Sequence, residues 1–595
     1  MRASISAKRY WATLFFVLTI FCVIVYQLLQ LMIFHRPTLL GQANKQHLLR
    51  MEIPPFRGPI LDRNGQELAT NLKVPSVYAV PRIATKREKD LLAEKAAKIL
   101  NLNIDKLRKK LDREKSFVWI KRRVSVDEAE KIGKLGSPVF GIVQEPKRFY
   151  PQGDLLAQVI GFVDVDNRGL EGIELQFNKE LQGRSGFRVT KRDALGREIK
   201  SQEVNAVPSL DGNKIYLTID QYIQYLTERA IDRAFNEWHA KGAFAVVMNP
   251  HTGEILALAN RPTFDLNQFE KSQQESRRNR VVTDMYEPGS VFKIVAASAA
   301  LNEDKVTLET NFFCENGKYN YGPKVLHDVH SYGNLSFRDV IVKSSNIGAV
   351  KIAALLDPEV FYRYVRGFGF AERTGIDLPG EAPGFVRPPS QWSKTSAYNI
   401  PIGHEVMVTA LQIVRAMAVI ANGGKLVKPY VIWKVEDNAG VVLRETLPVI
   451  KDGVIKPEVA ETMRQILTGV VDEGTGKKAK IDGVAVAGKT GTAQKVLPGG
   501  KGYSHSTFMS SFVGFAPAED PQFVMVVVLD EPRPSYYGGT VAAPPVKEVF
   551  ESGLIYLKHI PENAKPLETK TPSPAEDAPK KTPSPAQVKA RSAAP

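Results

Sequence analysis

The pattern of hydrophobic and polar residues divides the first third of the chain into segments of different kinds. Residues 11–34 form a run of 24 residues without a charge, long enough to cross a bilayer as a helix. Charged and apolar residues recur at helical spacing over 86–135, and residues 187–192 follow a strand pattern. Between these segments, the turn sequence Asp62-Arg63-Asn64-Gly65 has apolar residues on both sides and predicts a hairpin.

A second region begins near residue 208. An amphipathic helix is predicted over 221–238, and helical patterns dominate from 291 to about 425. Strands are expected at 215–219, 243–248, 255–259, 483–488, 508–515 and 523–529. Because strands open and close this region and most helices lie between them, we expect an antiparallel sheet with helices on its faces.

The C-terminal end has a different composition. Residues 559–595 are rich in Pro, Ala, Lys and Ser, and the sequence Lys-Thr-Pro-Ser-Pro-Ala occurs at 570–575 and again at 581–586. Such a segment has too few apolar residues to form a packed core, so it is predicted to be a disordered tail.

Charge around the N-terminal apolar run indicates its orientation. Arg2, Lys8 and Arg9 precede the run, so the positive-inside rule keeps residues 1–10 in the cytoplasm and places the rest of the chain outside it. No small-residue cleavage site follows the run, which favours an uncleaved anchor over a signal peptide. We therefore expect a single-pass protein of the cytoplasmic (inner) membrane whose later domains are extracytoplasmic.

The formal net charge of the chain is +16. A basic chain often binds nucleic acid, but an anchor that exports the basic region argues against that function. Contact with anionic lipid, an anionic envelope polymer or a partner fits better, and an ordinary solvated surface fits equally well. The two cysteines, Cys22 and Cys314, offer neither a disulfide framework nor a zinc spacing.

Candidate chemistry begins at Ser290. This serine follows a Pro288-Gly289 turn and precedes an apolar helical run, so it lies at or near a helix N-terminus. Lys293 lies three residues later on the same helical face, and the pair could form a nucleophile with its own base. Taken alone, a Ser-x-x-Lys pattern is more often an N-cap beside a solvated lysine.

Two further patterns change that balance. Ser344-Ser345-Asn346 is expected in a loop after a helical stretch, and Lys489-Thr490-Gly491-Thr492 is expected directly after the strand at 483–488. Three such patterns in this order are the sequence signature shared by penicillin-binding proteins and class A β-lactamases. Each pattern is weak alone, and together they favour catalysis by Ser290.

With these motifs, the chain resembles the class B penicillin-binding proteins, the membrane-anchored peptidoglycan transpeptidases, over nearly its whole length. Further likenesses are the two pedestal motifs at 57–65 and 169–174, and the first transpeptidase hairpin at 253–257. The resemblance implies an α/β fold of the α+β type, with the transpeptidase domain similar to serine β-lactamases. It also implies five parts: a cytoplasmic tail (1–10), a transmembrane anchor (11–34), an elongated pedestal of the dimerisation type (35–210), a transpeptidase domain (211–558) and the tail (559–595).

The resemblance implies a catalytic role for three residues and no cofactor or metal. Ser290 would attack the carbonyl of the penultimate D-alanine in a D-Ala-D-Ala stem peptide, and Lys293 would be its base. The pKa of Lys293 would have to be lowered by burial and by the nearby cation Lys489. Ser344 would relay a proton to the leaving group. The amine of a neighbouring stem would then complete the cross-link, whereas β-lactams would be trapped on Ser290.

The resemblance also implies substrate-binding roles. Asn346 would hydrogen-bond the substrate amide. Lys489, Thr490 and Thr492, on either side of Gly491, would hold the substrate carboxylate. The backbone N–H groups of Ser290 and Thr492 would form the oxyanion hole.

Three other features are interpreted without a catalytic role. His327 and His330 in His327-Asp328-Val329-His330 lack a third metal ligand, and His404-Glu405 lacks the second histidine of a zinc-protease helix. Family members often carry a Gly-x-Gly segment where this chain has Gly403-His404-Glu405, which leaves that loop unassigned. Cys314 is expected to be a bystander.

Several functions stay open from the sequence. Within the fold, a β-lactamase or a D,D-carboxypeptidase is the first alternative, and a β-lactam sensor or a catalytically silent scaffold is the second. Within the family, chain length, the compact pedestal and the motif at 169–174 favour the septal, FtsI-like branch over the elongation branch. The partner that this resemblance implies is an FtsW-like membrane glycosyltransferase, with other division proteins.

Overall fold

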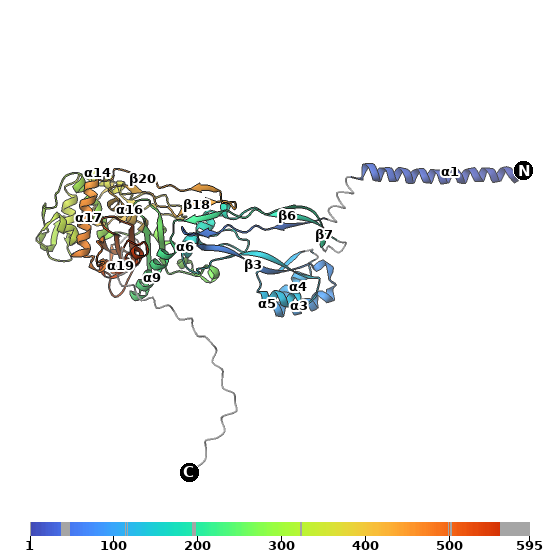
Figure 1. The fold of residues 1–595 in the computed structure, drawn as a ribbon, viewed down its shortest axis with the longest axis horizontal. Helices are drawn as coiled ribbons and strands as arrows, with labels where there is room; N and C mark the ends of the chain where they lie inside the picture. The colour runs from blue at the N-terminus through green and yellow to red at the C-terminus, as the bar shows by residue number, and fades with distance from the viewer. Residues whose placement is uncertain are drawn as a thin grey trace, which may run out of the picture.

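A computed structural model describes residues 2–36, 48–113, 115, 117–192, 198–321, 324–497, 499 and 502–559. From residue 48 onward the described chain is elongated, with long strands at one end and the larger, helix-rich domain at the other (Figure 1). Apart from His559, the tail predicted over 559–595 lies outside the described residues.

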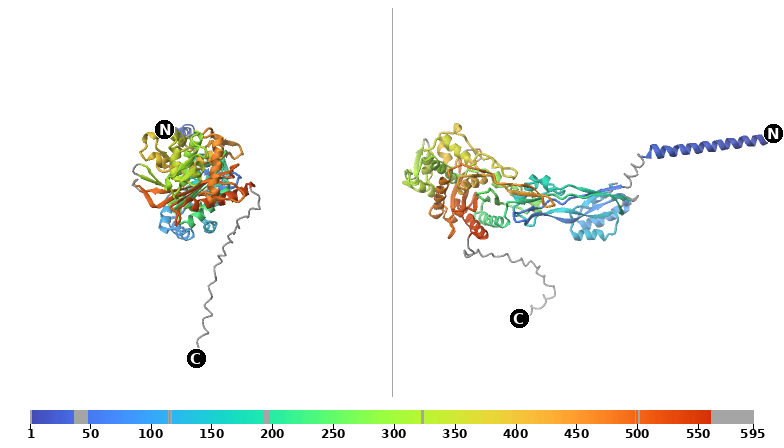
Figure 2. Two further views of the ribbon diagram at one scale, coloured as in Figure 1. Left: turned by 90° about the vertical axis from the view of Figure 1, so that its left-hand side faces the viewer. Right: turned by 45° about the horizontal axis from the view of Figure 1, so that its top comes forward.

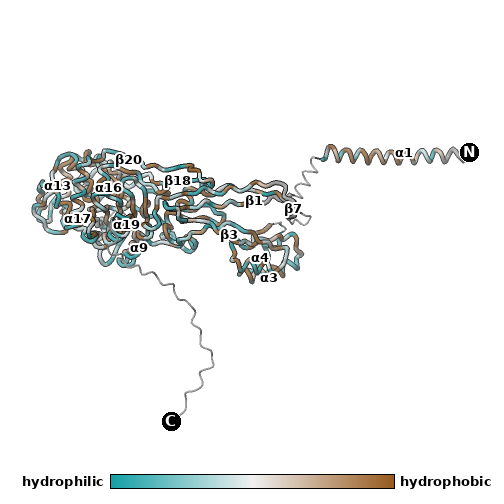
Figure 3. The backbone as a smooth tube through the Cα atoms, in the orientation of Figure 1, coloured by the Kyte–Doolittle hydropathy of each residue, from teal (hydrophilic) through white to brown (hydrophobic). Residues whose placement is uncertain are grey.

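The N-terminal apolar run is helical. Helix α1 (Arg2–Leu29) continues into the π-helical segment η1 (Gln30–Phe34), and hydrophobic residues occur along its length (Figure 3). The stretch Ala7–Ile33 has a mean hydropathy of 2.4 and is the one candidate membrane span within the described residues. The chain therefore carries a single-pass membrane anchor.

The pedestal consists of long antiparallel strands with a small helical cluster. β3 (Glu67–Ala79) pairs with β5 (Phe140–Phe149), and a separate sheet has the order β1-β6-β7. The bounds of that sheet's strands are β1 (Leu48–Ile53), β6 (Gly186–Arg192) and β7 (Glu198–Val207). The strand predicted at 187–192 and the hairpin predicted at 62–65, which joins β2 (Ile60–Leu61) to β3, are confirmed.

The helical prediction for 86–135 is wrong in its centre. Helices α3 (Lys86–Leu100), α4 (Ile104–Leu111) and α5 (Val126–Gly133) form, but β4 (Val118–Lys121) lies between the last two. Val118 and Ile120 are buried and alternate with half-exposed neighbours, as in a strand with one buried face. The β-branched and aromatic residues of this segment favour the pleated conformation.

The two pedestal motifs meet in a buried charge cluster. Arg57 Nε lies 2.5 Å from Glu174 Oε2, and Arg148 Nε lies 2.6 Å from Glu174 Oε1. All three side chains are almost completely buried. A Cβ at Gly58 would lie 1.8 Å from Asn213 O, so the first motif also needs glycine where the chain approaches the start of the next domain.

A mixed sheet continues from the pedestal into the next domain. Its strand order is β19-β18-β8-β2-β3-β4, with β5 also paired to β3. β8 (Lys214–Leu217) pairs in parallel with β2 on one side and antiparallel with β18 (Ile432–Glu436) on the other. β19 (Val442–Glu445) forms the outer edge. Hydrogen bonds of this sheet therefore cross the boundary expected at 210/211.

The larger domain is organised around a five-stranded antiparallel sheet of order β10-β9-β23-β22-β21. Its strands are β9 (Gly242–Met248), β10 (Ile255–Arg261), β21 (Ala487–Val496), β22 (Tyr503–Ala516) and β23 (Phe523–Asp530). The antiparallel sheet is confirmed, as are the strands predicted at 243–248, 255–259, 508–515 and 523–529. The strand predicted at 215–219 is shorter and belongs to the mixed sheet.

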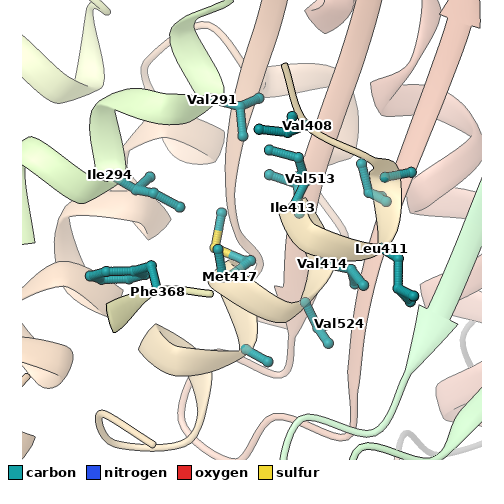
Figure 4. Close-up of a cluster of buried hydrophobic side chains, with 14 of the residues drawn as sticks. Val291, Ile294, Phe368, Val408, Leu411, Ile413, Val414, Met417, Val513 and Val524 are labelled. Atoms are coloured by element: carbon teal, nitrogen blue, oxygen red, sulfur yellow. The ribbon is translucent and has the colours of Figure 1, made fainter. Parts of the chain in front are cut away.

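Both faces of the five-stranded sheet are covered by helices (Figure 2). Alternate residues of β9 point into two different cores, with Phe244 in one and Ala245 in the other. α9 (Gln221–Glu237), which confirms the helix predicted over 221–238, packs with α19 (Ala543–Tyr556) on one face. α16 (Ala410–Ala421) packs against the other face, where its apolar residues meet Val513 and Val524 (Figure 4).

Further helices and short strand pairs complete the two domains. The remaining α-helices are α6 (Ala157–Ile160), α7 (Gly172–Gln176), α8 (Asn178–Leu181), α10 (Arg280–Thr283), α11 (Lys293–Asn302), α12 (Phe337–Val342), α13 (Asn346–Ala353), α14 (Pro358–Gly367), α15 (Ser396–Asn399), α17 (Pro457–Asp472) and α18 (Gly538–Val541). Of these, α6, α7 and α8 belong to the pedestal. The short strands are β11 (Asn311–Phe313), β12 (Lys318–Tyr321), β13 (Lys324–His327), β14 (Asn334–Ser336), β15 (Phe385–Val386), β16 (Val406–Met407), β17 (Leu426–Val427) and β20 (Ile450–Lys451).

One predicted strand is displaced along the chain. The segment expected as a strand at 483–488 begins instead as a turn, with Gly483 at φ +78°. The strand β21 starts at Ala487 and runs through Lys489-Thr490-Gly491-Thr492, so this motif lies within the edge strand of the five-stranded sheet and not after a strand. A left-handed glycine after Asp482 supplies the turn that the hydrophobic pattern alone did not reveal.

Candidate active site

Ser290 lies on a short 3₁₀ turn against the edge strand β21. The turn η5 (Gly289–Phe292) leads directly into α11, whose first residue is Lys293. Gly289 has φ +57°, and a Cβ there would lie 3.0 Å from Thr492 O, so glycine allows the turn to approach the strand. Ser290 is half-buried, and its hydroxyl makes no hydrogen bond to any residue that the structure describes. It is therefore available to a bound molecule.

The amine of Lys293 is fully buried and lies between two residues of the second motif. Its Nζ is 2.7 Å from Ser344 O, 3.3 Å from Ser344 Oγ and 2.8 Å from Asn346 Oδ1. Burial lowers the pKa of Lys293 to about 7, against the opposing effects of Asp328 and Cys314. At neutral pH about half of such amines are uncharged, which is the form that a base requires.

Ser344 connects the two buried lysines. Its Oγ lies 2.8 Å from Lys489 Nζ and 3.3 Å from Lys293 Nζ. The backbone of Ser344 is left-handed, with φ +60°, although the residue has a side chain. Non-glycine residues adopt this conformation at a cost, and they do so mostly where the surrounding structure requires it.

Asp328 holds the second motif in place. Its carboxylate accepts hydrogen bonds from Ser345 Oγ at 2.6 Å, from Asn346 N at 2.5 Å and from Ile347 N at 3.1 Å. These donors belong to the first residues of α13 and the residue before it, where backbone N–H groups favour a negative charge. In the sequence, Asp328 stood out only as part of the His327–His330 segment, which was not interpreted as a metal site. No local spacing connects Asp328 with the second motif, which begins 16 residues later at Ser344.

Cys314 also lies closer to the site than expected. Its side chain is completely buried, and Ser345 Oγ lies 3.4 Å from its sulfur. Cys314 therefore packs directly behind the second motif, and its expected lack of a catalytic role stays a prediction. His327 contributes through its backbone, because Asn346 Nδ2 donates to His327 O at 2.9 Å.

The third motif places a second fully buried amine opposite the first. Lys489 Nζ donates to Ser344 Oγ at 2.8 Å and approaches Thr490 O at 3.5 Å. Burial and the neighbouring Lys293 both lower the pKa of Lys489. With two acceptors in the protein, a charged Lys489 would have one N–H left for an incoming anion.

Gly491 and the two threonines complete the edge of the site. A Cβ at Gly491 would lie 2.3 Å from Ser511 Oγ and 2.8 Å from Pro288 O, so a larger residue would push the strand away from the Ser290 turn. Thr490 Oγ1 is 2.7 Å from Thr475 Oγ1. Thr492 Oγ1 accepts a hydrogen bond from Gly538 N at 3.1 Å and keeps its own proton for donation.

A buried carboxylate anchors the turn that carries Ser290. Glu287 accepts from Glu405 N at 2.9 Å and from Tyr503 OH at 3.1 Å, and it lies 2.8 Å from His404 Nδ1. Burial, and then the charge of Glu287, raise the pKa of Tyr503. The loop Gly403-His404-Glu405, which the sequence left unassigned, thus supports the Ser290 turn through hydrogen bonds. Gly403 has φ +79°, and its carbonyl accepts a hydrogen bond from Gly289 N at 3.2 Å.

The structure thus brings the eight predicted site residues to one place. It differs from the prediction in one contact, the one expected between Lys293 and Ser290. Lys293 faces Ser344 and Asn346, and no direct hydrogen bond joins it to Ser290 in the described structure. In unliganded active sites such contacts are often long and tighten when substrate binds. Asp328 and Glu287 were missed because their contacts connect segments distant in the sequence.

Comparisons with known proteins agree with this arrangement. A family model of the penicillin binding protein transpeptidase domain matches residues 243–551, which is more than half of the chain. A model of the penicillin-binding protein dimerisation domain matches residues 52–217. The first match contains all three motifs, and the second runs from the end of β1 to the end of β8.

Individual relatives match most of the chain. Stage V sporulation protein D of Bacillus subtilis is 36% identical over 509 residues, which cover 84% of this chain and 78% of that protein. The peptidoglycan D,D-transpeptidase FtsI of Escherichia coli K12 is 32% identical over 516 residues, which cover 85% of each. Among solved structures, penicillin binding protein 3 of Mycobacterium tuberculosis complexed with aztreonam matches with a TM-score of 0.67 and 28% identity, over 86% of this chain and 98% of that one.

Proposed function

Since the chain belongs to the class B penicillin-binding proteins and is a peptidoglycan D,D-transpeptidase, we propose that it cross-links stem peptides through an acyl-enzyme on Ser290 during septal wall synthesis. The observation that carries the proposal is the meeting of Lys293, Ser344 and Lys489 near Ser290, whose hydroxyl has no hydrogen-bond partner in the described part of the chain.

In the first step, Ser290 Oγ attacks the carbonyl carbon of the penultimate D-alanine. Its proton passes to neutral Lys293, whose pKa of about 7 leaves enough free base at neutral pH. The backbone N–H groups of Ser290 and Thr492 stabilise the oxyanion of the tetrahedral intermediate. Lys293 must turn from Ser344 Oγ, its longest contact at 3.3 Å, to accept this proton.

In the second step, the tetrahedral intermediate loses the terminal D-alanine. The C–N bond breaks, the leaving nitrogen takes a proton from Ser344 Oγ, and Ser344 regains one from the lysines that contact it. The amine of a neighbouring stem then attacks the Ser290 ester and gives its proton back through the same groups. The result is a new amide bond and a free serine.

Substrate binding follows from the donors along β21 and the second motif. The terminal carboxylate of the donor stem binds Lys489 and the hydroxyls of Thr490 and Thr492, while Gly491 keeps the strand close to the turn. Asn346 hydrogen-bonds the substrate amide. A carboxylate beside Lys489 would favour its charged form, so binding and protonation of this lysine are coupled.

Transfer to an amine fits this site better than hydrolysis. A β-lactamase or carboxypeptidase needs a group that activates water for deacylation. Asp328 and Glu287, the carboxylates that contact the catalytic segments, are each occupied by three hydrogen-bond contacts. Neither is arranged to take a proton from water, which favours a long-lived acyl-enzyme that waits for an acceptor amine and that also traps β-lactams.

The cellular assignment extends the same proposal. The anchor holds residues 1–10 in the cytoplasm, and the pedestal (35–210) carries the transpeptidase domain (211–558) outside the cytoplasmic membrane. An FtsW-like glycosyltransferase contacts the anchor and pedestal. The septal role is supported by similarity to FtsI, and a role in sporulation is the second candidate because of the 36% identity to stage V sporulation protein D.

Fluorescent penicillin labelling of the purified protein tests the chemistry. The wild-type protein should label covalently, Ser290→Ala should not label, and Ser290→Cys should label slowly or not at all. A wild-type protein that fails to label would refute the acyl-enzyme. Depletion tests the cellular role: filaments support septation, rounded cells indicate elongation, and a defect confined to spores indicates the second candidate.

A further inference from the structure

A groove of about 640 Å³ opens where the pedestal meets the transpeptidase domain, remote in sequence from the three catalytic motifs. Three aspartates (Asp62, Asp154 and Asp220) and three tyrosines (Tyr222, Tyr225 and Tyr556) contribute to its lining. No lysine, arginine or histidine is among the described residues that line it. In a chain of net charge +16, an acidic groove with aromatic walls is an unusual local environment.

Two of the aspartates form a negatively charged floor. Asp62 and Asp220 are buried, and the donors to their Oδ2 atoms are neutral: Gln221 N for Asp62, and Asn64 Nδ2 and Tyr556 OH for Asp220. The adjacent cation, Arg63, pairs instead with Glu254 at 3.6 Å. Hydrogen bonds thus satisfy these carboxylates, but within the described residues neither has a lysine or arginine nitrogen in ion-pair contact.

The walls present aromatic surface to the solvent. The rings of Tyr222 and Tyr556 lie 4.7 Å apart between centroids, and Tyr225 follows one helical turn after Tyr222. Their side chains are between 40% and 51% exposed, which is high for such large residues. Grooves lined by aromatic residues bind proline-rich segments in the polyproline II conformation, and acidic residues beside them select basic ones.

The end of the described chain lies at this groove. Tyr556 belongs to the lining and is three residues before His559, the last residue that the structure describes. The 36 residues that follow contain eight prolines, and from residue 578 onward their charged residues are all basic: Lys580, Lys581, Lys589 and Arg591. The second Lys-Thr-Pro-Ser-Pro-Ala repeat lies among these basic residues.

We propose that residues 579–591 of the C-terminal tail dock in this groove. The repeat places prolines against the tyrosines, and the flanking lysines lie over Asp62, Asp154 and Asp220. About 20 residues separate His559 from Lys580, which is ample for a chain that spans roughly 3 Å per residue when extended and only has to return to its own starting point. Tethering raises the local concentration of the segment to the millimolar range, so modest contacts are sufficient.

Docking would connect three parts of the molecule. Asp62 lies in the turn between β2 and β3 of the pedestal, Tyr222 and Tyr225 lie on α9, and Tyr556 ends α19. A segment bound across these elements acts as a clamp on the junction between the pedestal and the transpeptidase domain. This role does not depend on the septal assignment or on the acyl-enzyme.

Photo-cross-linking in the purified full-length protein tests the docking. p-Benzoylphenylalanine replaces Tyr225, and irradiation followed by peptide mass spectrometry should join position 225 to residues 579–591. The same amino acid in place of Tyr537, an exposed tyrosine of the transpeptidase domain, is the control and should give no tail product. Both variants should be labelled by fluorescent penicillin to the same extent as the wild-type protein, which verifies that each is folded.

Charge variants show whether the groove recognises this segment. Asp154→Asn, an exposed change, should reduce the tail product about threefold, and K580E/K581E/K589E/R591E should abolish it. The control changes K565E/K570E, which lie before the first repeat and at its first residue, should leave the yield unchanged. Mixing isotope-labelled and unlabelled protein before irradiation distinguishes cross-links within one molecule from cross-links between two molecules. Three results would overturn the proposal: no tail product, a product unaffected by the charge variants, or a product that forms only between two molecules.

Discussion

The rate of Ser290 acylation by a β-lactam should rise about tenfold between pH 6 and pH 8. Lys293 must be uncharged to accept the serine proton, and its pKa of about 7 makes the neutral fraction roughly one-tenth at pH 6, half at pH 7 and nine-tenths at pH 8. The rate should therefore level off above pH 8. An ordinary lysine, with a pKa near 10.4, would instead give a rate that keeps rising about tenfold per pH unit through pH 9.

Replacement of Asp328 by asparagine should move this profile to lower pH. The charge of Asp328 raises the pKa of Lys293, so its removal lowers that pKa and moves the midpoint below the wild-type value. The amide keeps the shape of the side chain, and its oxygen can still accept from Asn346 N and Ile347 N. Asp339→Asn on α12 is the matched control, because Asp339 is not among the groups that shift the pKa of Lys293.

Stopped-flow measurement of the acylation rate constant with fluorescent penicillin, from pH 5.5 to 9.5 at constant ionic strength, provides the readout. Thermal unfolding midpoints at each pH identify any loss of fold. A wild-type rate that is flat between pH 6 and pH 8, or that shows its midpoint near 10, would refute the assignment of Lys293 as the base. An Asp328→Asn midpoint that moves to higher pH would refute the electrostatic argument.

Four other changes give sharp expectations. Gly491→Ala should slow acylation at least tenfold, because its Cβ would lie 2.8 Å from Pro288 O and displace the strand from Ser290; wild-type rates would contradict this close approach. Glu174→Gln should lower the free energy of unfolding by about 3–5 kcal/mol in denaturant titrations, since it leaves two buried arginines without a countercharge, and a loss under 1 kcal/mol would contradict the argument. Glu287→Ala should lower the free energy of unfolding by about 2–4 kcal/mol and also slow acylation. A loss of stability with a wild-type acylation rate would show that Glu287 does not hold the Ser290 turn in place. Lys489→Met should abolish acylation yet raise the midpoint of thermal unfolding. Because folding lowers the pKa of Lys489, this gain in stability should be largest at acid pH and should fade as the pH rises toward about 10. A midpoint that is unchanged at every pH would contradict this expectation.

The sequence predicted the architecture well where local pattern and burial agree. The fully buried strands β9 and β23 are nearly continuous apolar runs, and a sheet covered by helices on both faces requires such runs. The prediction was wrong at 483–488, where Gly483 forms a turn, and at 118–121, where four residues leave a helical pattern to become a strand. Short segments like these are decided by neighbours distant in the sequence.

In the candidate site too, features with a local spacing were predicted, whereas contacts between distant segments were not. Ser290, Lys293 and the other motif residues were predicted because their spacing is local, and the structure brings them together. The direction of the Lys293 side chain, toward Ser344 and Asn346, depends on a loop about 50 residues away. Asp328 and Glu287 left no comparable signal, because a carboxylate that caps another segment has no fixed spacing from its partner.

The energetics of the two lysines give an independent reason to regard this place as functional. Both amines are completely buried, both have lowered pKa values, and neither forms an ion pair with a carboxylate of the residues that the structure describes. A sequence selected for stability alone would place apolar side chains here, because an uncompensated buried amine costs several kcal/mol. The surrounding sheet, whose strands β9, β10 and β23 are buried along their whole length, is large enough to tolerate that cost. Ser344 is left-handed, and the Ser290 hydroxyl has no hydrogen-bond partner among the described residues. With these two serines, the lysine pair is best explained by chemistry that needs one amine as a free base and another as an anion receptor.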